Sequence, residues 1–487
     1  MLYDARMMRW LVVSMLVAVV GCTKPNPRSC IDGSCSDPNF PFCDVSGQFG
    51  EGANTCLAVT CDANAFVACS GDTALVCNAV GNNYDPHACG VSCDATKGCI
   101  DCLVDNDCGA AAPHCDGDGS CVECLDSTQC ADPSKPFCDD SLHACRGCSI
   151  DDECDSKVCD DTSGSCVDSS KVIYAAPDGI LFDCGTLAVP CSFQGAVDQV
   201  DGTRTVIKLL PGTYAETVTA RSKVFAVHGD GATLHPADTA AAGLTVTNGD
   251  ATVTVVGMAF ERGVGAGANA AITCNADSSP ARGNVVLDRV SVTVPQNGVT
   301  LCKATVTRSS FKATTATPGV LLFSGTISRS RFEGGRVQMP TVGPSGFGDF
   351  AENCLFINTQ VESGTDAAVR FSTLINSVVL CGQTGSPQPN RINLTDDIMV
   401  STSAIETGVC DHHHVVAMPA PLPGGTNDNV TTEDPRFVNA AAGDYHLMPG
   451  SPAIDAADPT ATSTTDYDGK PRPIGAGKDI GAFEFKP

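Results

Sequence analysis

The heptapeptide TVTRSSF at residues 305–311 is polar and β-branched until it ends in one aromatic residue, Phe311. A near copy, TISRSRF at residues 326–332, ends in Phe332 after a further 21 residues (332 − 311 = 21). Side chains of a strand alternate between its two faces, so each Phe shares a face with the smaller residue two positions earlier. The repeat predicts short strands that each bury one aromatic side chain at the same place.

The window recurs through the carboxyl-terminal half of the chain, and each copy ends in a large apolar anchor. The anchors are Phe260, Val292, Phe311, Phe332, Phe356, Ile375 and Val400. The residues two positions before them are Met258, Val290, Ser309, Ser330, Cys354, Thr373 and Ile398. The last five steps are 19, 21, 24, 19 and 25 residues, with Gly, Pro, Asn and Ser between the windows. Short strands at this period favour a solenoid whose coils stack about 4.8 Å apart, with the anchors in one apolar column.

Two other architectures fit the period less well. A leucine-rich repeat would show a Leu/Asn consensus, which the windows lack. A β-sandwich would show hairpin turn signals about every 8–12 residues and no regular anchor.

The two ends of this region carry a resemblance. Residues 172–214, VIYAAPDGILFDCGTLAVPCSFQGAVDQVDGTRTVIKLLPGTY, resemble the start of right-handed parallel β-helix proteins of the pectate-lyase-like class. The resemblance implies a short capping helix over about residues 192–200, pinned by a Cys184–Cys191 disulfide. The motifs SPAIDAA at Ser451, DGKPRP at Asp468 and DIGAFE at Asp479 resemble the closing segment of bacterial surface β-helix proteins called choice-of-anchor Q.

The fold class expected for residues 171–487 is therefore all-β, a right-handed single-stranded parallel β-helix. This fold hosts lyases, hydrolases, adhesins and inert stalks, so it does not by itself specify an activity.

Residues 30–170 differ from the rest in composition. They hold 25 Asp or Glu and 4 Lys or Arg, a net of 4 − 25 = −21 out of −27 for the whole chain. Cysteine spacing repeats in three units that open C-x5-C at Cys102, Cys124 and Cys148, with an earlier copy over residues 30–56 and a different module over 61–102. Because these units hold almost no Leu, Ile or Phe, disulfides worth about 2–4 kcal/mol each must stabilise them. Their connectivity stays open.

This region is expected to act as a disulfide-stapled stalk. It resembles cysteine-rich repeats of bacterial surface proteins and, distantly, small Dickkopf-type modules, which implies spacing or protein contact. Two ion sites compete with that interpretation. Cys-x2-Cys pairs would suit zinc, but an oxidising compartment favours disulfides. Asp105, Asp107, Asp116 and Asp118 would suit Ca²⁺, but they lack the spacing of a calcium loop, and a solvated acidic surface is the favoured explanation.

The amino terminus predicts the compartment. Residues 1–21 have a basic start and an apolar run too short to span a bilayer, as in a signal peptide. The sequence VVGC resembles a bacterial lipobox, which makes Cys22 the lipidation site and residues 22–29 a tether. The alternative is a simple signal peptide with Cys22 in a disulfide. Thr23, directly after the lipidated cysteine, resembles the residue found there in outer-membrane lipoproteins. We therefore expect an extracytoplasmic protein that its amino-terminal lipid alone holds at the outer membrane or cell surface of a Gram-negative bacterium.

The sequence predicts no group of residues that could act together in catalysis. The neighbours Asp396 and Asp397 would point to opposite faces of a strand, and the signature motifs of β-helix hydrolases are missing. In the run His412–His414, alternation allows only the first and third side chains to converge, so no metal site is predicted. The pairs Cys274–Cys302 and Cys381–Cys410 are expected disulfides. They leave Cys354 as a small buried residue.

One row of charged residues is a candidate binding site. Arg289, Arg308, Arg329 and then Asn353 precede the inner residue in successive coils. Stacked about 4.8 Å apart, their side chains would suit the carboxylates or sulfates of an anionic glycan or peptide. The alternative is solvated surface charge balanced by neighbours such as Asp288 and Glu333.

These observations favour a surface-displayed β-helix that binds a polysaccharide or a surface protein. A polysaccharide lyase or glycosidase is the first alternative, and a purely structural surface component is the second. No cofactor is expected, and Ca²⁺ is kept as the alternative. Nucleic acid is excluded as a partner because a net charge of −27 repels phosphates. The oligomeric state is left open.

Overall fold

The structure is a computed structural model that describes residues 28–30, 33–49, 52–240, 242–263, 270–275, 283–295, 297–314, 320–339, 349–363, 367–381, 391–406, 409–418 and 427–487. Cys22, the expected signal peptide and residues 22–27 of the tether lie outside these ranges. The chain divides into two compact units, Met1–Ser149 with Cys159–Ser165, and Ile150–Val158 with Cys166–Pro487. Within the described part of the chain, no helix has the length and apolar character needed to cross a bilayer.

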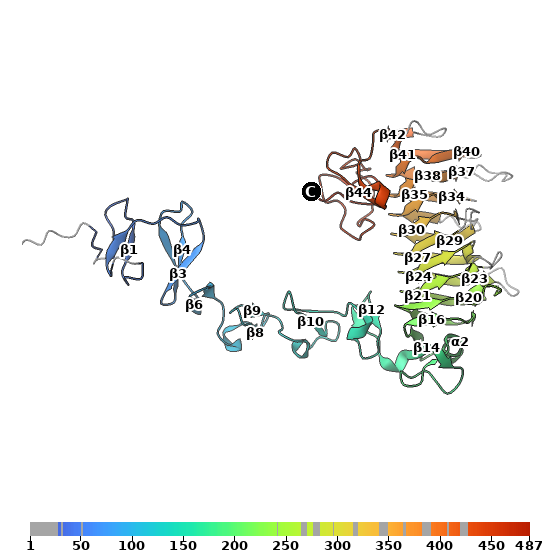
Figure 1. Ribbon diagram of the computed structural model, residues 1–487, viewed down its shortest axis with the longest axis horizontal. Coiled ribbons are helices and arrows are strands. Elements are labelled where there is room, and N and C mark those ends of the chain that lie inside the picture. Colours follow the sequence, from blue (N-terminus) through green and yellow to red (C-terminus); the bar gives the residue numbers. More distant parts are fainter. Residues whose placement is uncertain are drawn as a thin grey trace, which may run out of the picture. The chain divides into compact units, whose positions relative to one another are not determined.

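The cysteine-rich part consists of small antiparallel sheets and single turns of 3₁₀ helix (Figure 1). The paired strands are β1 (Phe42–Asp44) with β2 (Thr55–Leu57), β3 (Phe66–Ser70) with β4 (Thr73–Cys77) and β5 (Tyr84–Ala88), β6 (Ser92–Asp94) with β7 (Gly98–Ile100), β8 (His114–Cys115) with β9 (Cys121–Val122), β10 (Phe137–Asp139) with β11 (Ala144–Arg146), and β12 (Cys159–Asp160) with β13 (Ser165–Cys166). The 3₁₀ turns are η1 (Asp105–Asp107), η2 (Ser127–Gln129), η3 (Asp151–Glu153) and η4 (Ser169–Lys171).

Each repeated cysteine unit joins its first cysteine to its third and its second to its fourth. The pairs are Cys30–Cys43 and Cys35–Cys56, Cys102–Cys115 and Cys108–Cys121, Cys124–Cys138 and Cys130–Cys145, and Cys148–Cys159 and Cys154–Cys166. The intervening module has its own pattern, Cys61–Cys77, Cys69–Cys93 and Cys89–Cys99. The repeat in spacing is therefore a repeat in connectivity.

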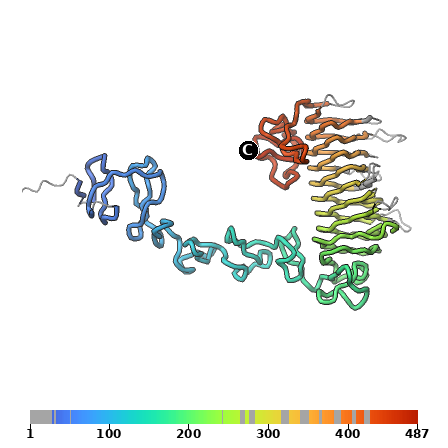
Figure 2. The backbone as a smooth tube through the Cα atoms, viewed as in Figure 1, coloured from blue at the N-terminus to red at the C-terminus, as the bar shows by residue number. Residues whose placement is uncertain are grey.

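The second unit is a parallel β-helix whose coils stack as successive rungs (Figure 2). Each full coil contributes a strand to three faces, named here A, B and C in chain order. Face A contains β14 (Val172–Ile180), β15 (Val206–Leu209), β18 (Val224–His228), β21 (Thr252–Val256), β24 (Asn284–Asp288), β27 (Cys302–Thr307), the end of β29 (Val320–Ser328), β32 (Asp349–Glu352), β35 (Ala367–Arg370), β38 (Arg391–Thr395), the start of β41 (Val409–Met418) and β42 (Asn427–Thr431).

Faces B and C complete the coils. Face B contains β16 (Gly212–Tyr214), β19 (Ala232–Leu234), β22 (Ala259–Glu261), β25 (Ser291–Val294), β28 (Ser310–Ala313), β30 (Arg331–Glu333), β33 (Leu355–Ile357), β36 (Thr373–Ile375), β39 (Ile398–Val400) and the end of β41. Face C contains β17 (Val218–Arg221), β20 (Ala242–Thr247), β23 (Ala270–Asn275), β26 (Asn297–Thr300), the start of β29, β31 (Arg336–Met339), β34 (Gln360–Ser363), β37 (Val378–Cys381) and β40 (Ser403–Glu406).

A short helix closes the first coil, as the sequence predicts. Helix α2 (Phe193–Gln199) begins after Ser192, whose side chain accepts a hydrogen bond from the Gly195 N–H. It buries Phe193, Ala196 and Val197 over the end of the tube. The disulfide Cys184–Cys191 holds the loop before it.

The interior contains the predicted column. The rings of Phe311 and Phe332 stack with centroids 5.1 Å apart, and those of Phe332 and Phe356 with centroids 5.3 Å apart. All three rings are buried. The repeated Phe thus fills the tube, coil over coil.

The last two anchors are wrong by one residue. Phe356 pairs with Leu374 and then Met399, so these residues, and not Ile375 and Val400, point inward. The inner residues two positions earlier are accordingly Ser372 and Asp397. The assignment failed because both faces of these strands are apolar, which removes the alternation that fixes register.

The outer side of face B explains that apolarity. In the earlier coils it carries Glu261, Ser310 and Lys312, whereas in the later coils it carries Leu355, Ile357, Thr373, Ile375 and Ile398. The carboxyl-terminal segment covers these later coils with Leu447, Ala453, Ile480, Tyr445, Ala482 and Phe483. This segment contains β43 (Phe437–Asn439), η5 (Ala440–Ala442) and β44 (Asp444–Leu447), and it lies beside the later coils in Figure 1.

The inner residues Ser309, Ser330, Ser372 and Asp397 accept backbone hydrogen bonds from the preceding coil inside the tube. The Val290 N–H donates to Ser309 Oγ at 3.0 Å, the Ser309 N–H to Ser330 Oγ at 3.1 Å, and the Cys354 N–H to Ser372 Oγ at 3.1 Å. The Ser372 N–H donates to Asp397 Oδ1 at 2.7 Å. Because backbone N–H groups at the corner leave the sheet, small polar side chains must satisfy them.

Residues 150–158 belong to the second unit, although the sequence places the start of the β-helix at residue 171. Val158 packs against Val172 and Tyr174, and the Tyr174 hydroxyl donates to the Ser156 carbonyl at 3.0 Å. These contacts add a short upstream segment to the first coil.

Candidate functional site

The corner between faces A and B is a turn of one residue in left-handed conformation. Its φ is 54° at Arg289, 49° at Arg308, 48° at Arg329 and 54° at Asn353. The column continues through Phe371, Asp396, His414 and Asn429. The row expected from the sequence is therefore a real column, located at a corner. Gly257, Asn353 and Asp396 also have positive φ, and Gly, Asn and Asp adopt this conformation more readily than other residues. Their occurrence at this position is the feature of the sequence from which the corner could have been predicted.

Arg289 and Arg308 share one carboxylate. Arg308 Nε donates to Asp288 Oδ1 at 2.7 Å, and its Nη2 contacts Asp288 Oδ2. Arg289 Nε lies 3.7 Å from Asp288 Oδ2, and Thr307 Oγ1 donates to Asp288 Oδ1 at 2.7 Å. Asp288 thus offsets one of the two positive charges, which supports in part the alternative interpretation of the row.

Arg329 and Asn353 are covered by the carboxyl-terminal segment. Arg329 Nε donates to the Tyr467 carbonyl at 3.1 Å. Asn353 is 3% exposed, donates from Nδ2 to the Thr465 carbonyl at 2.8 Å, and accepts at Oδ1 from Arg472 Nη2 at 3.2 Å. The expectation of one four-residue binding row is corrected here, because these two residues bind the chain's own segment.

A buried ion pair organises that segment. The side chains of Arg472 and Glu484 are both 0% exposed, and Arg472 Nη1 lies 2.6 Å from Glu484 Oε1. Arg472 also donates to the carbonyls of Asp479 and Gly481, and its guanidinium lies 4.6 Å from the centre of the Phe371 ring. Burial lowers the pKa of Arg472, and the Glu484 carboxylate opposes this shift. The motifs DGKPRP and DIGAFE thus supply the two partners that close the segment on itself.

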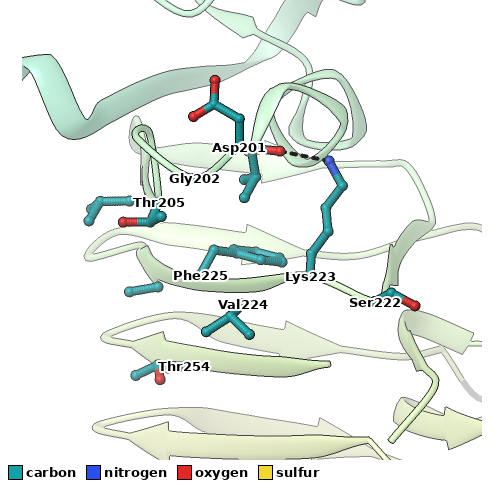
Figure 3. Close-up of a pocket in the computed structure, with 11 residues that line it drawn as sticks. Asp201, Gly202, Thr205, Ser222, Lys223, Val224, Phe225 and Thr254 are labelled. Carbon is teal, nitrogen blue, oxygen red and sulfur yellow. Dashed lines mark hydrogen bonds between the residues drawn. The ribbon is translucent and has the colours of Figure 1, made fainter. Parts of the chain in front are cut away.

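Face A carries an open groove near its first coils (Figure 3). It has a volume of about 630 Å³ and is lined by Val200, Asp201, Gly202, Thr205, Val206, Ser222, Lys223, Val224, Phe225, Ala226 and Thr254. Val224 is 61% exposed. Lys223 Nζ donates to the carbonyls of Asp198 and Val200, both at 2.9 Å, so its charge is held at one end of the groove. Sequence reasoning did not find this groove, because its residues come from three coils and the end of α2.

A cluster of charged groups lies on the same outer side of face A as the groove, toward the carboxyl ends of β15 and β18. Lys208 Nζ lies 2.5 Å from Asp151 Oδ2, and both side chains are largely buried. Burial lowers the pKa of His228 and raises that of Asp230. The Lys208–Asp151 pair holds the upstream segment to the coil.

Asp396 and Asp397 point in different directions because Asp396 is the left-handed corner residue between β38 and β39, and both are 0% exposed. Asp397 points into the tube. Asp396 accepts at Oδ1 from the Asp458 N–H at 2.7 Å and at its carbonyl from the Gly481 N–H at 2.8 Å. Burial raises the pKa of Asp396 and raises that of Asp397 well above its usual value. A polymer cannot reach this pair.

The three histidines at residues 412–414 lie in different environments. His412 is 0% exposed and stacks on the buried Leu394 inside the tube. His413 is on the outer side of face A, with Nδ1 3.4 Å from Asp428 Oδ2. His414 is at the corner with a φ of 52°. Because the corner residue breaks strand alternation, His413 and His414, and not His412 and His414, share the outside of the coil.

The remaining cysteines of the β-helix pair as expected, Cys274–Cys302 and Cys381–Cys410. Cys354 is fully buried, and burial raises the pKa of its thiol to about 12. Such a thiol is not a nucleophile at neutral pH.

The acidic residues of the cysteine-rich part shape its turns. An Asp follows a cysteine at the start of five turns and accepts backbone N–H groups from the turn. These residues are Asp44, Asp94, Asp116, Asp139 and Asp160. Asp116 Oδ1, for example, accepts from the N–H groups of Asp118 and Ser120, both at 2.8 Å. The clusters of cysteine sulfurs that would suit a metal are the disulfides described above.

The chain has structural neighbours among solved proteins. No protein-family model matches the chain, and no curated protein sequence is similar to it at a significant level. The crystal structure of pectate lyase Pel9A matches with a TM-score of 0.39 and 14% sequence identity over 65% of this chain and 96% of that chain. The elements of the chain themselves make it nearly all-β, with a parallel β-helix and a disulfide-rich region before it. Identity at this level assigns no activity.

Proposed function

We propose that the protein is a lipid-anchored binding protein displayed at the cell surface, and that its β-helix binds a neutral polysaccharide along face A. The open groove carries this proposal, because it combines an exposed apolar side chain, Val224, with the hydroxyl-bearing side chains of Ser222, Thr205 and Thr254. Ligand sites of this volume commonly have such a mixed lining.

The charges favour a neutral glycan over an anionic one. Asp288 binds both accessible arginines of the corner column, and Asp201 adds a carboxylate to the groove. A polyanion would have to displace Asp288, and the chain outside residues 30–170 is itself acidic, with a net charge of −27 − (−21) = −6.

Binding is favoured over catalysis because the neighbouring carboxylates that the sequence offered, Asp396 and Asp397, are buried. Fourteen disulfides among the described residues support an oxidising, extracytoplasmic compartment. Attachment through Cys22 remains part of the proposal.

Affinity electrophoresis of the full chain through gels containing neutral or uronate polysaccharides tests it. Retardation by a neutral glycan, reduced about tenfold or more by Val224→Glu, is the expected result. Val438→Glu is the matched control, because Val438 is 52% exposed on the carboxyl-terminal segment. Release of new reducing ends or unsaturated products would establish the enzyme instead. No retardation by any glycan would favour a protein partner or a structural role.

A further inference from the structure

The first cysteine repeat carries a longer loop than the other three. Twelve residues separate its third and fourth cysteines, Cys43 and Cys56 (56 − 43 − 1 = 12), whereas five or six do so in the later repeats (121 − 115 − 1 = 5, 145 − 138 − 1 = 6 and 166 − 159 − 1 = 6). The longer loop contains Phe49, and the shorter loops contain no aromatic residue. Asp44 is 1% exposed and holds the loop, since its Oδ2 accepts from the Phe49 N–H at 2.7 Å and its Oδ1 from the Gly47 N–H at 2.8 Å.

Phe49 belongs to a cluster of three aromatic rings, here called the aromatic cluster, that joins the first repeat to the next module. Its ring centroid lies 5.3 Å from that of Phe42 in β1 and 5.3 Å from that of Tyr84 in β5. The centroids of Phe42 and Tyr84 are 4.7 Å apart. All three residues are only partly buried, so the rings remain accessible from outside.

The aromatic cluster lines a pocket of about 370 Å³. Side chains of the three-stranded sheet β3–β4–β5 line the same pocket. In this sheet Pro86 lies opposite Leu75, and Ser70 lies opposite Thr73. Because Thr73 and Leu75 are two residues apart on one strand, they share a face of the sheet. The pocket therefore has apolar and hydroxyl-bearing side chains side by side.

The lining offers hydroxyl and amide groups but no free charge. Asp44 is the only acidic or basic residue among those that line the pocket, and backbone N–H groups of its own loop bind both of its oxygens. Asn83 accepts at Oδ1 from the Tyr84 N–H at 2.9 Å, which leaves its Nδ2 to donate to a ligand. Ser70 and Thr73 add two hydroxyl groups. An ionic ligand would find no counter-charge here, whereas a neutral ligand with hydroxyl groups and an apolar face would be matched.

We infer that this pocket binds a neutral pyranose sugar, with a carbon–hydrogen face of the sugar against the aromatic cluster and its hydroxyl groups on Asn83, Ser70 and Thr73. Aromatic rings supply rigid apolar area, and a few placed polar groups orient the ligand, as in other small-molecule sites of this volume. The pocket lies in the cysteine-rich unit, so the inference does not rest on the groove of face A. It gives that unit a binding role in addition to spacing.

Saturation-transfer difference NMR on the full, disulfide-intact chain tests the site, in a Val224→Glu background that blocks the groove of face A. The probes are maltose, cellobiose, lactose and mannobiose, with irradiation of the aromatic protons. We expect transfer to at least one of them. Phe49→Ala and Tyr84→Ala should each weaken its binding by at least about tenfold, because each removes a ring of the aromatic cluster. Tyr84→Phe keeps the ring and should bind within about threefold of the background chain.

Phe137→Ala is the matched control. In CADPSKPFC at residues 130–138, Phe137 takes the place that Phe42 has in CSDPNFPFC at residues 35–43. The guanidinium of Arg146 lies over its ring, 5.9 Å from the centre, and its repeat lacks the longer loop. The substitution should leave the transfer unchanged. Disulfide mapping by mass spectrometry establishes that each variant has the parent's pairing.

Three results would overturn the site. The first is no transfer to any of the four sugars in the Val224→Glu background, and transfer in the parent chain would then confine sugar binding to face A. The second is transfer that survives Tyr84→Ala in a correctly paired chain. The third is an equal loss in Phe137→Ala. Transfer that Val224→Glu leaves intact and Tyr84→Ala removes would support the pocket even if the groove of face A binds no glycan.

Discussion

The two units of this chain are stable for different reasons. In the first, the only buried hydrophobic residues that are not cysteines are Val59, Ala74 and Leu75, among those described. In the second, apolar side chains from every coil form one continuous core. The first unit therefore depends on cross-links that restrict the unfolded chain, and the second on apolar surface removed from water. Each of the following experiments acts mainly on one of these two mechanisms.

Reduction should produce the largest difference. Each disulfide of the cysteine-rich repeats contributes about 2–4 kcal/mol, and no apolar core replaces it. Under dithiothreitol, hydrogen exchange should become fast throughout residues 52–149 while the strands of face B stay protected. Protection retained in the first unit after full reduction would show that it has a core of its own.

Phe332→Ala should act only on the second unit. The ring is 0% exposed and stacks on Phe311 and Phe356, so its loss should cost about 3–5 kcal/mol. Denaturant unfolding monitored on the β-helix measures the effect. Phe182→Ala is the control, because Phe182 is 77% exposed and should cost little.

Arg472→Met should release the carboxyl-terminal segment from the later coils. Removing one partner of a buried ion pair leaves Glu484 uncompensated and costs about 3–5 kcal/mol. Limited proteolysis should then cleave within residues 433–487 while leaving the coils intact. Resistance equal to that of the parent chain would mean that apolar packing alone holds the segment.

The pH dependence of the same segment is expected to be smaller. Burial raises the pKa of Asp479 from 3.8 to about 6. Since this pKa is higher in the folded state, the stability it contributes is complete below pH 3.8 and is lost as pH rises to about 6. The loss is at most about 3 kcal/mol. Comparing the pH slope of unfolding for the parent chain and Asp479→Asn measures this, because the variant should lack that part of the slope.

Arg308→Ala should have the smallest effect. The side chain is 39% exposed and pairs with Asp288 at the surface, so its removal should change stability by no more than about 1 kcal/mol. A neutral glycan should still bind the groove with unchanged affinity. A large loss of glycan binding would restore the corner arginines as the ligand site.

The sequence was sufficient where a pattern is local and repeated. The spacing of Phe260, Phe311 and Phe332 predicts the stacked coils, and cysteine spacing predicts the modules. It failed where distant segments meet. Ile375 and Val400 point outward, but they are apolar because the carboxyl-terminal segment packs on them. Their apolar character made them look like inward-facing anchors. Asn353 looked like a ligand residue because nothing local reveals that Arg472, 119 residues away, binds it.

What the sequence alone determined is the coil, because an inward side chain every 19 to 25 residues can be buried only by stacking on its counterpart in the next coil. Only the tertiary structure decided which outer surfaces stay open. The open groove of face A brings together residues from three coils and the end of α2, and Asn353 is covered by Arg472, which is distant from it in the chain.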